Sequence, residues 1–196
     1  MSNLVQLYSA ALNGLQAIPV EVEVHSSKGV KTILVGLPDN AVKESTERIY
    51  AALYNTFGSL TQQKYTINMA PADIRKEGTA YDLPIAIGML ATSERIECHN
   101  LKHYMVVGEL GLDGTIRPVH GALPIAIKAR EMRLEGLIVP QDNVREAAVV
   151  NKLKVYGANH LAEVVDFLNG KPALQPTEID TRREFAEHQA TFDNDF

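Results

Sequence analysis

Four groups of residues in this chain have side chains and spacing that could do chemistry, and the first is the charged loop 73–78. Its sequence places Arg75 and Lys76 between two acidic residues, Asp73 and Glu77. Two adjacent cations can hold a phosphate group or a partner's carboxylate. The two acids can equally pair with them and leave a solvated loop. The loop therefore offers either a partner or nucleic-acid contact or an internally paired turn.

The second group is the glycine-rich run 108–114, which has the spacing G-x-x-G-x-x-G. It differs from the G-x-x-x-x-G-K-[ST] pattern of a P-loop, and that pattern occurs nowhere in the chain. Phosphate binding by such a loop needs backbone N–H groups at the start of a helix. This run instead contains Asp113-Gly114 and leads into Thr115, which is typical of a hairpin turn.

The third group is Ser26, Ser27 and Lys28, which could in principle supply a serine nucleophile and a lysine base. Consecutive strand residues point to opposite faces, so the three side chains do not converge. A working pair also needs a desolvated lysine that can lose its proton. A turn is the favoured interpretation, and no catalytic residue is assigned.

The fourth group is the segment 98–103, where Cys98, His99 and His103 bring a thiol and two imidazoles together. Structural zinc takes four protein ligands and catalytic zinc usually takes three. The other histidines lie in unrelated segments, so an ordinary loop is favoured and no metal site is assigned. Since Cys98 is the only cysteine, an intrachain disulfide is excluded.

The elements that must position these residues begin with strands. Apolar and acidic residues alternate over 18–25, which predicts a half-exposed strand. A turn at 26–29 then predicts a hairpin to a returning strand at 31–36. A weaker alternation over 5–12 predicts a third strand in the same sheet.

A first helix is predicted from Pro38 and Asp39 to about residue 55, since proline and an acid both suit a first turn. Lys43 and Arg48 fall on its polar face. Residues 65–69 predict another strand.

A second helix is predicted over 82–92, with Asp82 as its N-cap. That helix is apolar on nearly all sides and is therefore expected to be buried.

The second half of the chain alternates strands and helices. The expected elements are strands at 105–110, 115–117, 136–140 and 154–156, and helices at 122–133, 142–150 and 160–168. Such alternation predicts parallel strands in this half and hairpins in the first half. The expected fold class is therefore α/β, with a mixed (α+β) sheet.

Composition sets bounds on the class of protein. Apolar residues make up 45% and charged residues 22%, which is typical of a globular domain. We expect one domain over 1–170 and an acidic, proline-containing linker over 171–196. The net charge of −5 lacks the basic footprint of a dedicated nucleic-acid domain, although a local basic patch is compatible with it. Neither a signal peptide nor a membrane span is apparent, so a cytoplasmic location is expected.

Several blocks, taken in order, resemble the N-terminal domain of the YifB/ComM family of magnesium chelatase-related AAA+ ATPases. The blocks are GLPD (36–39), VKES (42–45) with Arg48, NMAPAD (68–73), RKEG (75–78), DLPIA (82–86), GEL (108–110) with Asp113 and Gly114, RPV (117–119) with Gly121, and IVP (138–140). The resemblance covers residues 4–170. It implies the fold of the Lon peptidase domain and of the second domain of a small-subunit ribosomal protein.

The resemblance also bears on catalysis. Lon-like peptidases carry a serine and a lysine at two helix starts, and the matching segments here offer Ile85 and Leu123. Both side chains are aliphatic, so the resemblance carries over the fold and not proteolysis. We expect a non-catalytic accessory or interaction domain, with no cofactor or metal of its own.

In the family an AAA+ module follows this domain, and its opening resembles the last residues of this chain. The resemblance thus implies an ATP and magnesium site beyond Phe196, a hexameric full-length protein and action on DNA in competence. The expected partners are that module and DNA, and no membrane. Arg75, Lys76, Lys43 and Arg48 are the candidate contacts. The alternatives are a Lon-like Ser-Lys peptidase and a free-standing nucleic-acid-binding domain.

Overall fold

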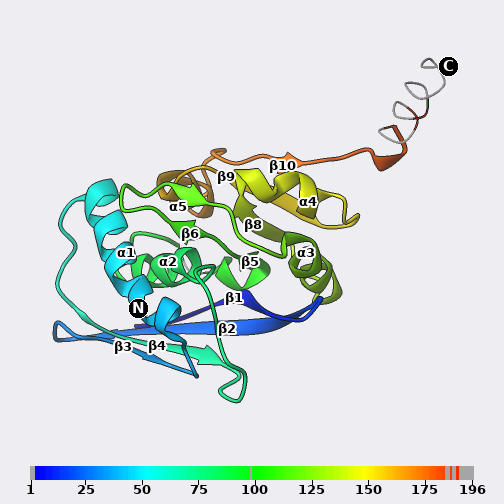
Figure 1. Ribbon diagram of the computed structural model, residues 1–196. Coiled ribbons are helices and arrows are strands. Elements are labelled where there is room, and N and C mark those ends of the chain that lie inside the picture. The colour runs from blue at the N-terminus through cyan, green and yellow to red at the C-terminus, as the bar shows by residue number, and fades with distance from the viewer. Residues whose placement is uncertain (1–2, 98, 184–185, 187–188, 190–196) are drawn as a thin grey trace.

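An eight-stranded mixed sheet forms the centre of the computed structural model, which describes residues 3–97, 99–183, 186 and 189 (Figure 1). The strand order is β10-β9-β8-β5-β1-β2-β4-β3. A separate two-stranded ribbon is formed by β6 (Glu109–Leu110) and β7 (Ile116–Arg117). The predicted mixed α/β class is confirmed.

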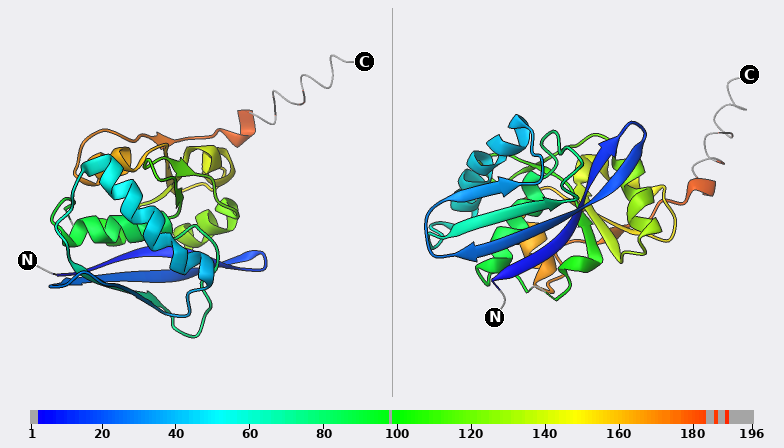
Figure 2. Two further views of the ribbon diagram at one scale, coloured as in Figure 1. Left: turned by 60° about the vertical axis from the view of Figure 1, so that its left-hand side comes forward. Right: turned by 90° about the horizontal axis from the view of Figure 1, so that it is seen from below.

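The first half of the sheet is an antiparallel ribbon. β1 (Leu4–Asn13), β2 (Gln16–Ser27) and β4 (Lys64–Ala70) pair antiparallel along their lengths. Alternate residues of β2 are fully buried, because one face of the ribbon packs on helices α1 (Asn40–Phe57) and α2 (Asp82–Thr92). The opposite face lies open in the view from below (Figure 2).

The predicted hairpin between 18–25 and 31–36 is wrong. β3 (Thr32–Val35) pairs in parallel with β4 and does not touch β2, because β4 lies between them. The burial patterns of β3 and β4 explain why β4 lies between β2 and β3. β4 buries every second residue and fits a central position, whereas no residue of β3 is buried and it forms the edge.

The second half of the sheet is largely parallel and is covered on both faces. β5 (Tyr104–Val106), β8 (Gly136–Pro140) and β9 (Lys154–Ala158) run parallel, and β10 (Pro176–Thr177) adds antiparallel to β9. All five residues of β8 are buried. Side chains on one face join α3 (Ala122–Glu131) and α4 (Val144–Ala148), and those on the other join α2 and α5 (Leu161–Leu168).

The strand ladder that joins the two halves consists of one residue pair. β1 pairs with β5 solely through Tyr8 and Met105. β5 has three residues, whereas β1 has ten, so the last part of β1 extends past its parallel neighbour. This arrangement leaves a backbone edge of β1 facing the functional region described below.

The remaining elements are the 3₁₀ turns η1 (Leu101–His103) and η2 (Gln141–Asn143). Part of the predicted linker packs on the domain, since Leu174 is buried and Pro176 pairs with Tyr156. The helical turn predicted at 184–188 falls almost entirely outside the described residues. No helix in the described part of the chain has the length and apolar character needed to span a membrane.

Candidate functional site

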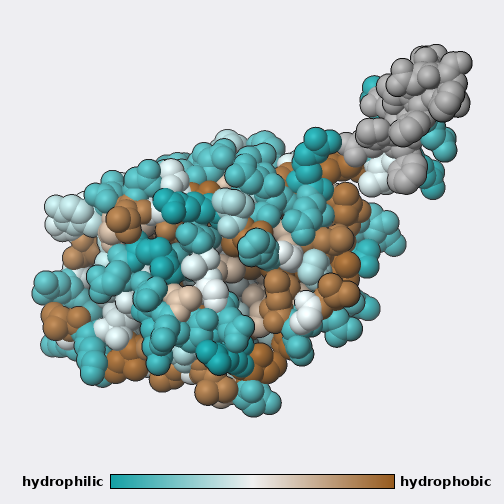
Figure 3. All heavy atoms as spheres, in the orientation of Figure 1, coloured by the Kyte–Doolittle hydropathy of each residue, from teal (hydrophilic) through white to brown (hydrophobic). Residues whose placement is uncertain are grey.

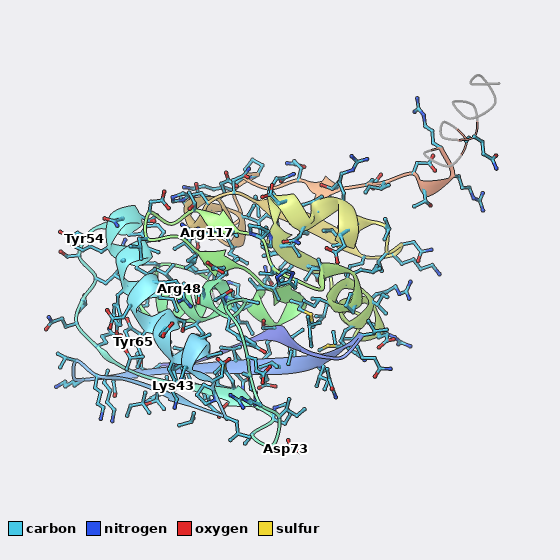
Figure 4. All side chains as sticks on the ribbon, viewed as in Figure 1. Lys43, Arg48, Tyr54, Tyr65, Asp73 and Arg117 are labelled. Atoms are coloured by element: carbon cyan, nitrogen blue, oxygen red, sulfur yellow. The ribbon has the colours of Figure 1, made fainter. Side chains whose placement is uncertain are left out.

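Two of the four predicted contact residues lie at the surface. The side chain of Arg75 is 69% exposed and lies 3.3 Å from Glu77, which is equally exposed. Lys43 is exposed near the start of α1 (Figure 4). An exposed pair of this kind contributes little to stability, so Arg75 is able to exchange its partner for another anion.

Lys76 is buried, and the expectation that it contacts a partner from the surface is not met in this structure. It has no exposed area, and its ammonium donates to the carbonyl of Pro71 across the loop. Its backbone is also tied down, because Lys76 N donates to Leu37 O at 3.0 Å and Asp39 N donates to Lys76 O at 2.9 Å. Burial lowers the pKa of Lys76 below its ordinary value.

Arg48 is engaged in an ion pair inside the domain. Its Nε lies 2.7 Å from Asp82 Oδ2, and its Nη2 lies 3.0 Å from Asp82 Oδ1. Asp82 is fully buried and also accepts a hydrogen bond from Leu110 N at 3.1 Å. Arg48 therefore joins α1 to α2 through Asp82.

Burial sets the ionisation of this pair. It raises the pKa of Asp82, while Arg48 and the Leu110 N–H act in the opposite direction. The hydrogen bond to Asp82 raises the pKa of Arg48. Asp82 was expected to cap α2 but does not, since Tyr81 is the N-cap residue and makes no side-chain cap bond.

A cavity of about 790 Å³, here called the edge cavity, opens beside the end of β1. It lies between the 74–81 loop and α3. Its apolar wall is formed by Ala10, Leu12, Val119 and Ile125. Figure 3 shows a hollow in this face of the molecule, with hydrophobic residues gathered on its α3 side.

The other wall of the edge cavity is polar. Thr79 Oγ1 donates to Glu109 Oε2 at 2.5 Å, and Glu109 Oε1 lies 3.9 Å from Arg117. Asp39 also lines the cavity, and its carboxylate accepts from Val42 N at 2.8 Å and from Gly78 N at 3.3 Å. Asp39 thus caps α1 and holds the loop to the helix start.

Further charged and titratable groups complete this wall. Glu77 and Arg75 stand at its rim, and His120 lies near the start of α3. Tyr81 forms part of the floor, where burial raises its pKa, assisted by Asp39 and Glu77. The wall is therefore rich in carboxylates.

The two positions matched to the Lon-like serine and lysine do not line this cavity. Ile85 is fully buried in α2, where it faces the core. Because the side chain of Ile85 does not reach the edge cavity, its aliphatic character gives no information about the chemistry of that cavity. Leu123 is 37% exposed at the start of α3. The lining residues in the described chain include no serine, cysteine or lysine, and Thr79 carries their one aliphatic hydroxyl.

The remaining candidate groups are dispersed. Ser26 is buried within β2, which continues to Ser27, so the turn predicted at 26–29 begins two residues later. His99 pairs with Glu97 at 3.1 Å, and His103 pairs with Glu135 at 3.0 Å. Cys98 lies outside the described residues. Within the described residues, no group of three metal-ligating side chains converges.

Thr79 and Glu109 were missed by the sequence reasoning. Glu109 belongs to the GEL block at 108–110, so the resemblance marked its segment without giving it a role. Thr79 and Glu109 are 30 residues apart and meet where the two segments are joined by backbone bonds, Gly108 N to Ala80 O and Leu83 N to Gly108 O, each 3.0 Å. Spacing along the chain holds no signal for such a pair.

The chain resembles known proteins over most of its length. Residues 20–143 match the family described as subunit ChlI of Mg-chelatase. Competence protein ComM of Haemophilus influenzae is 43% identical over 173 residues, which are 88% of this chain and 34% of that protein. Protein YifB of Escherichia coli is 42% identical over 180 residues, or 90% of this chain and 35% of that protein.

A more distant relation reaches the peptidases. Lon protease of Aster yellows witches'-broom phytoplasma is 25% identical over 165 residues, which are 77% of this chain and 20% of that protein. The chain spans about a third of the length of its ComM and YifB relatives.

The fold and the Lon relation define a mixed α/β domain of the Lon-like class. Within that class the chain belongs to the magnesium chelatase-related family, that of ChlI, ComM and YifB.

Proposed function

We propose that this chain is a non-catalytic accessory domain of a magnesium chelatase-related AAA+ ATPase that acts on DNA. The observation that carries the proposal is the 43% identity to competence protein ComM over 88% of the chain. The ATP and magnesium site, the hexameric assembly and the cytoplasmic location belong to the full-length protein in this proposal. The absence of a P-loop motif from the 196 residues supports that division.

The composition of the edge cavity supports a non-catalytic role. A Ser-Lys pair needs a hydroxyl beside a desolvated amine. In the described structure, Thr79 Oγ1 is bonded to a carboxylate, and Lys76 Nζ is bonded to the Pro71 carbonyl. Neither geometry presents a nucleophile together with an amine base.

Arg75 and Lys43 carry the DNA contact in this proposal. Both are exposed, and the backbone bonds between 37–39 and Lys76 hold the 73–78 loop against the start of α1. Arg48 contributes indirectly, by fixing α1 on α2 through Asp82. A phosphate could replace Glu77 as the partner of Arg75.

The test is DNA binding by the full-length protein as a function of salt. Arg75→Glu with Lys43→Glu should weaken binding and reduce the slope of log K against log salt by about 1 for each phosphate that is no longer neutralised. The matched control is Lys102→Glu with Lys154→Glu, two exposed lysines outside the 73–78 loop and α1. Equal slopes for both double variants would remove Arg75 and Lys43 from the interface.

A peptidase is the second candidate, and the contact between Thr79 and Glu109 favours testing it. A carboxylate that accepts a hydrogen bond from a hydroxyl, with the two oxygens 2.5 Å apart, has the geometry of a general base. Incubation with unfolded casein should leave the substrate intact. Hydrolysis that disappears in Thr79→Ala and survives in Thr56→Ala would replace the accessory function with a peptidase.

A further inference from the structure

The last part of β1 has an edge without a partner strand, and that edge opens into the edge cavity. β2 pairs with β1 along its whole length, whereas pairing with β5 is confined to Tyr8 and Met105. β5 ends at the next residue, and Gly108 N then donates to Ala80 O. Val107 shares a core cluster with Ala10, and the cavity takes the space beyond it beside the end of β1.

The register identifies the backbone groups on this edge. Ser26 N donates to Asn3 O at 2.9 Å, and the ladder places these residues opposite one another. Hydrogen-bonded pairs alternate along an antiparallel ladder, so the odd-numbered residues of β1 bond to β2. The N–H and C=O groups of Ala10 and Leu12 therefore point to the other edge. Within the described chain the β1–β5 ladder supplies them no partner.

Unpaired backbone groups on a strand edge select for another backbone. An extended peptide provides N–H and C=O groups at the same two-residue spacing, and it can add to the edge as a strand. Both residues also line the edge cavity. Leu12 is 44% exposed whereas Ala10 is buried, so a ligand reaches the edge from the Leu12 end, between the two cavity walls.

The charges of the edge cavity define which peptide fits. Asp39, Glu77 and Glu109 line it, and Arg75 is the one arginine or lysine among its described lining residues. Arg75 is already paired with Glu77. Arg117 lies 3.9 Å from Glu109. The three carboxylates therefore outnumber the two arginines beside them, and the cavity complements a cation. Its opposite wall is aliphatic and complements small apolar side chains.

We propose that the edge cavity binds an extended peptide segment that adds to β1 at Ala10 and Leu12 and places a lysine or arginine side chain against Glu77 and Glu109. Its apolar neighbours lie against the α3 wall. The volume of about 790 Å³ falls within the range of sites that enclose small ligands, so a segment of a few residues fits. The peptide site shares the rim pair Arg75–Glu77 with the proposed DNA contact and differs from it in the strand pairing to β1.

The test uses the 196-residue chain and a fluorescein-labelled heptapeptide, GAVRVAG, in a fluorescence anisotropy titration. Saturable binding is expected, and the acidic counterpart GAVEVAG should bind at least about tenfold more weakly. A version of GAVRVAG that is N-methylated at alternate residues should also lose binding, since it cannot complete the strand ladder. Hydrogen exchange should show protection of the Ala10 and Leu12 amides by GAVRVAG.

Two arginine substitutions give a matched pair. Leu12 is 44% exposed on the cavity wall, and Leu15 is 94% exposed at the tip of the same hairpin. Leu12→Arg places a competing cation in the cavity and should weaken GAVRVAG binding by about tenfold or more. Leu15→Arg should leave it unchanged. Circular dichroism of both variants establishes that they fold.

Four results would overturn the proposal. They are the absence of saturable binding, equal affinity for GAVRVAG and GAVEVAG, equal effects of the two arginine substitutions, and protection of Ala10 and Leu12 by a ten-nucleotide thymidine oligonucleotide but not by the peptide. The DNA-binding assay with Arg75 and Lys43 is scored independently, so failure of either proposal leaves the other standing on its own measurement.

Discussion

Arg48 of α1 and Asp82 of α2 form a two-point ion pair with contacts of 2.7 and 3.0 Å. Asp82 is completely buried, whereas the Arg48 side chain retains 22% exposure. The arginine reaches in from the surface and neutralises a carboxylate at the start of a helix whose residues are all buried. The pair therefore sets how α1 lies on α2, and through Asp39 it sets the position of the 73–78 loop.

Removal of the arginine tests this role. Arg48→Met leaves Asp82 buried without a counter-charge and should lower the free energy of unfolding by about 3 kcal/mol. Adding Asp82→Leu to Arg48→Met should recover most of that loss, because no charge is then buried alone. Urea denaturation measures both. Lys43→Met, on the exposed face of the same helix, is the control and should change stability by less than about 0.5 kcal/mol. Equal losses in the single and double variants would contradict the ion-pair account.

Lys76 should make the free energy of unfolding depend on pH between neutral and alkaline conditions. Burial lowers its pKa in the folded state, so between that pKa and the unfolded value of about 10.4 the unfolded chain binds more protons. The contribution of Lys76 is therefore least favourable at neutral pH and improves as pH rises. Urea denaturation at neutral and alkaline pH should show wild type gaining stability relative to Lys76→Met. A difference that falls or stays constant with rising pH would contradict burial of the ammonium, and the exposed Lys43→Met provides the baseline.

Gly36 should tolerate no side chain. Its φ is +104°, and a Cβ there would lie 2.2 Å from the carbonyl oxygen of Met69. Gly36→Ala should thus cost at least about 3 kcal/mol, since backbone strain and a collision with β4 combine. Gly78 is the matched control, because its φ is +84° and a Cβ there meets nothing within 4 Å. Gly78→Ala should cost about 1 kcal/mol, and equal thermal stability of the two variants would exclude the collision.

His160 should act as a helix cap and a tie to the β6–β7 turn. Its Nδ1 accepts from Ala162 N at 3.1 Å, and its Nε2 donates to Asp113 O at 2.9 Å. His160→Ala should lower the free energy of unfolding by about 1 kcal/mol, whereas His160→Asn should retain most of the capping contribution. Thermal denaturation checks the order wild type, Asn, Ala. A more stable alanine variant would show that the imidazole does not cap α5.

Local patterns predicted the elements well because burial imposes their period. The alternation in β2 and β4 and the wholly apolar α2 each follow from the face that the element buries. The partner of β3 could not be predicted in the same way, since a strand's own pattern does not say which neighbour it meets. The intervening β4 arrives only after an 18-residue helix.

The candidate site was less accessible to sequence reasoning. Asp82 has the residue type of an N-cap, but its carboxylate is bound by an arginine 34 positions earlier. In the sequence Lys76 has the character of a surface cation, but in the structure its ammonium is buried and donates to the carbonyl of Pro71. The edge cavity is formed by β1, the 74–81 loop, Glu109 and α3 together, so no single segment of the sequence predicts it.

The backbone ladder between the two halves of the sheet is reduced to the bridge between Tyr8 and Met105, while α2 packs on both halves. Hydrogen bonding is continuous within the antiparallel ribbon and within the parallel half, and it is thinnest where they meet. Sub-global opening of a protein follows the line that breaks the fewest interactions. We therefore expect the two halves to exchange amide hydrogens as separate cooperative units, with a small rotation between them widening or narrowing the cavity at the junction.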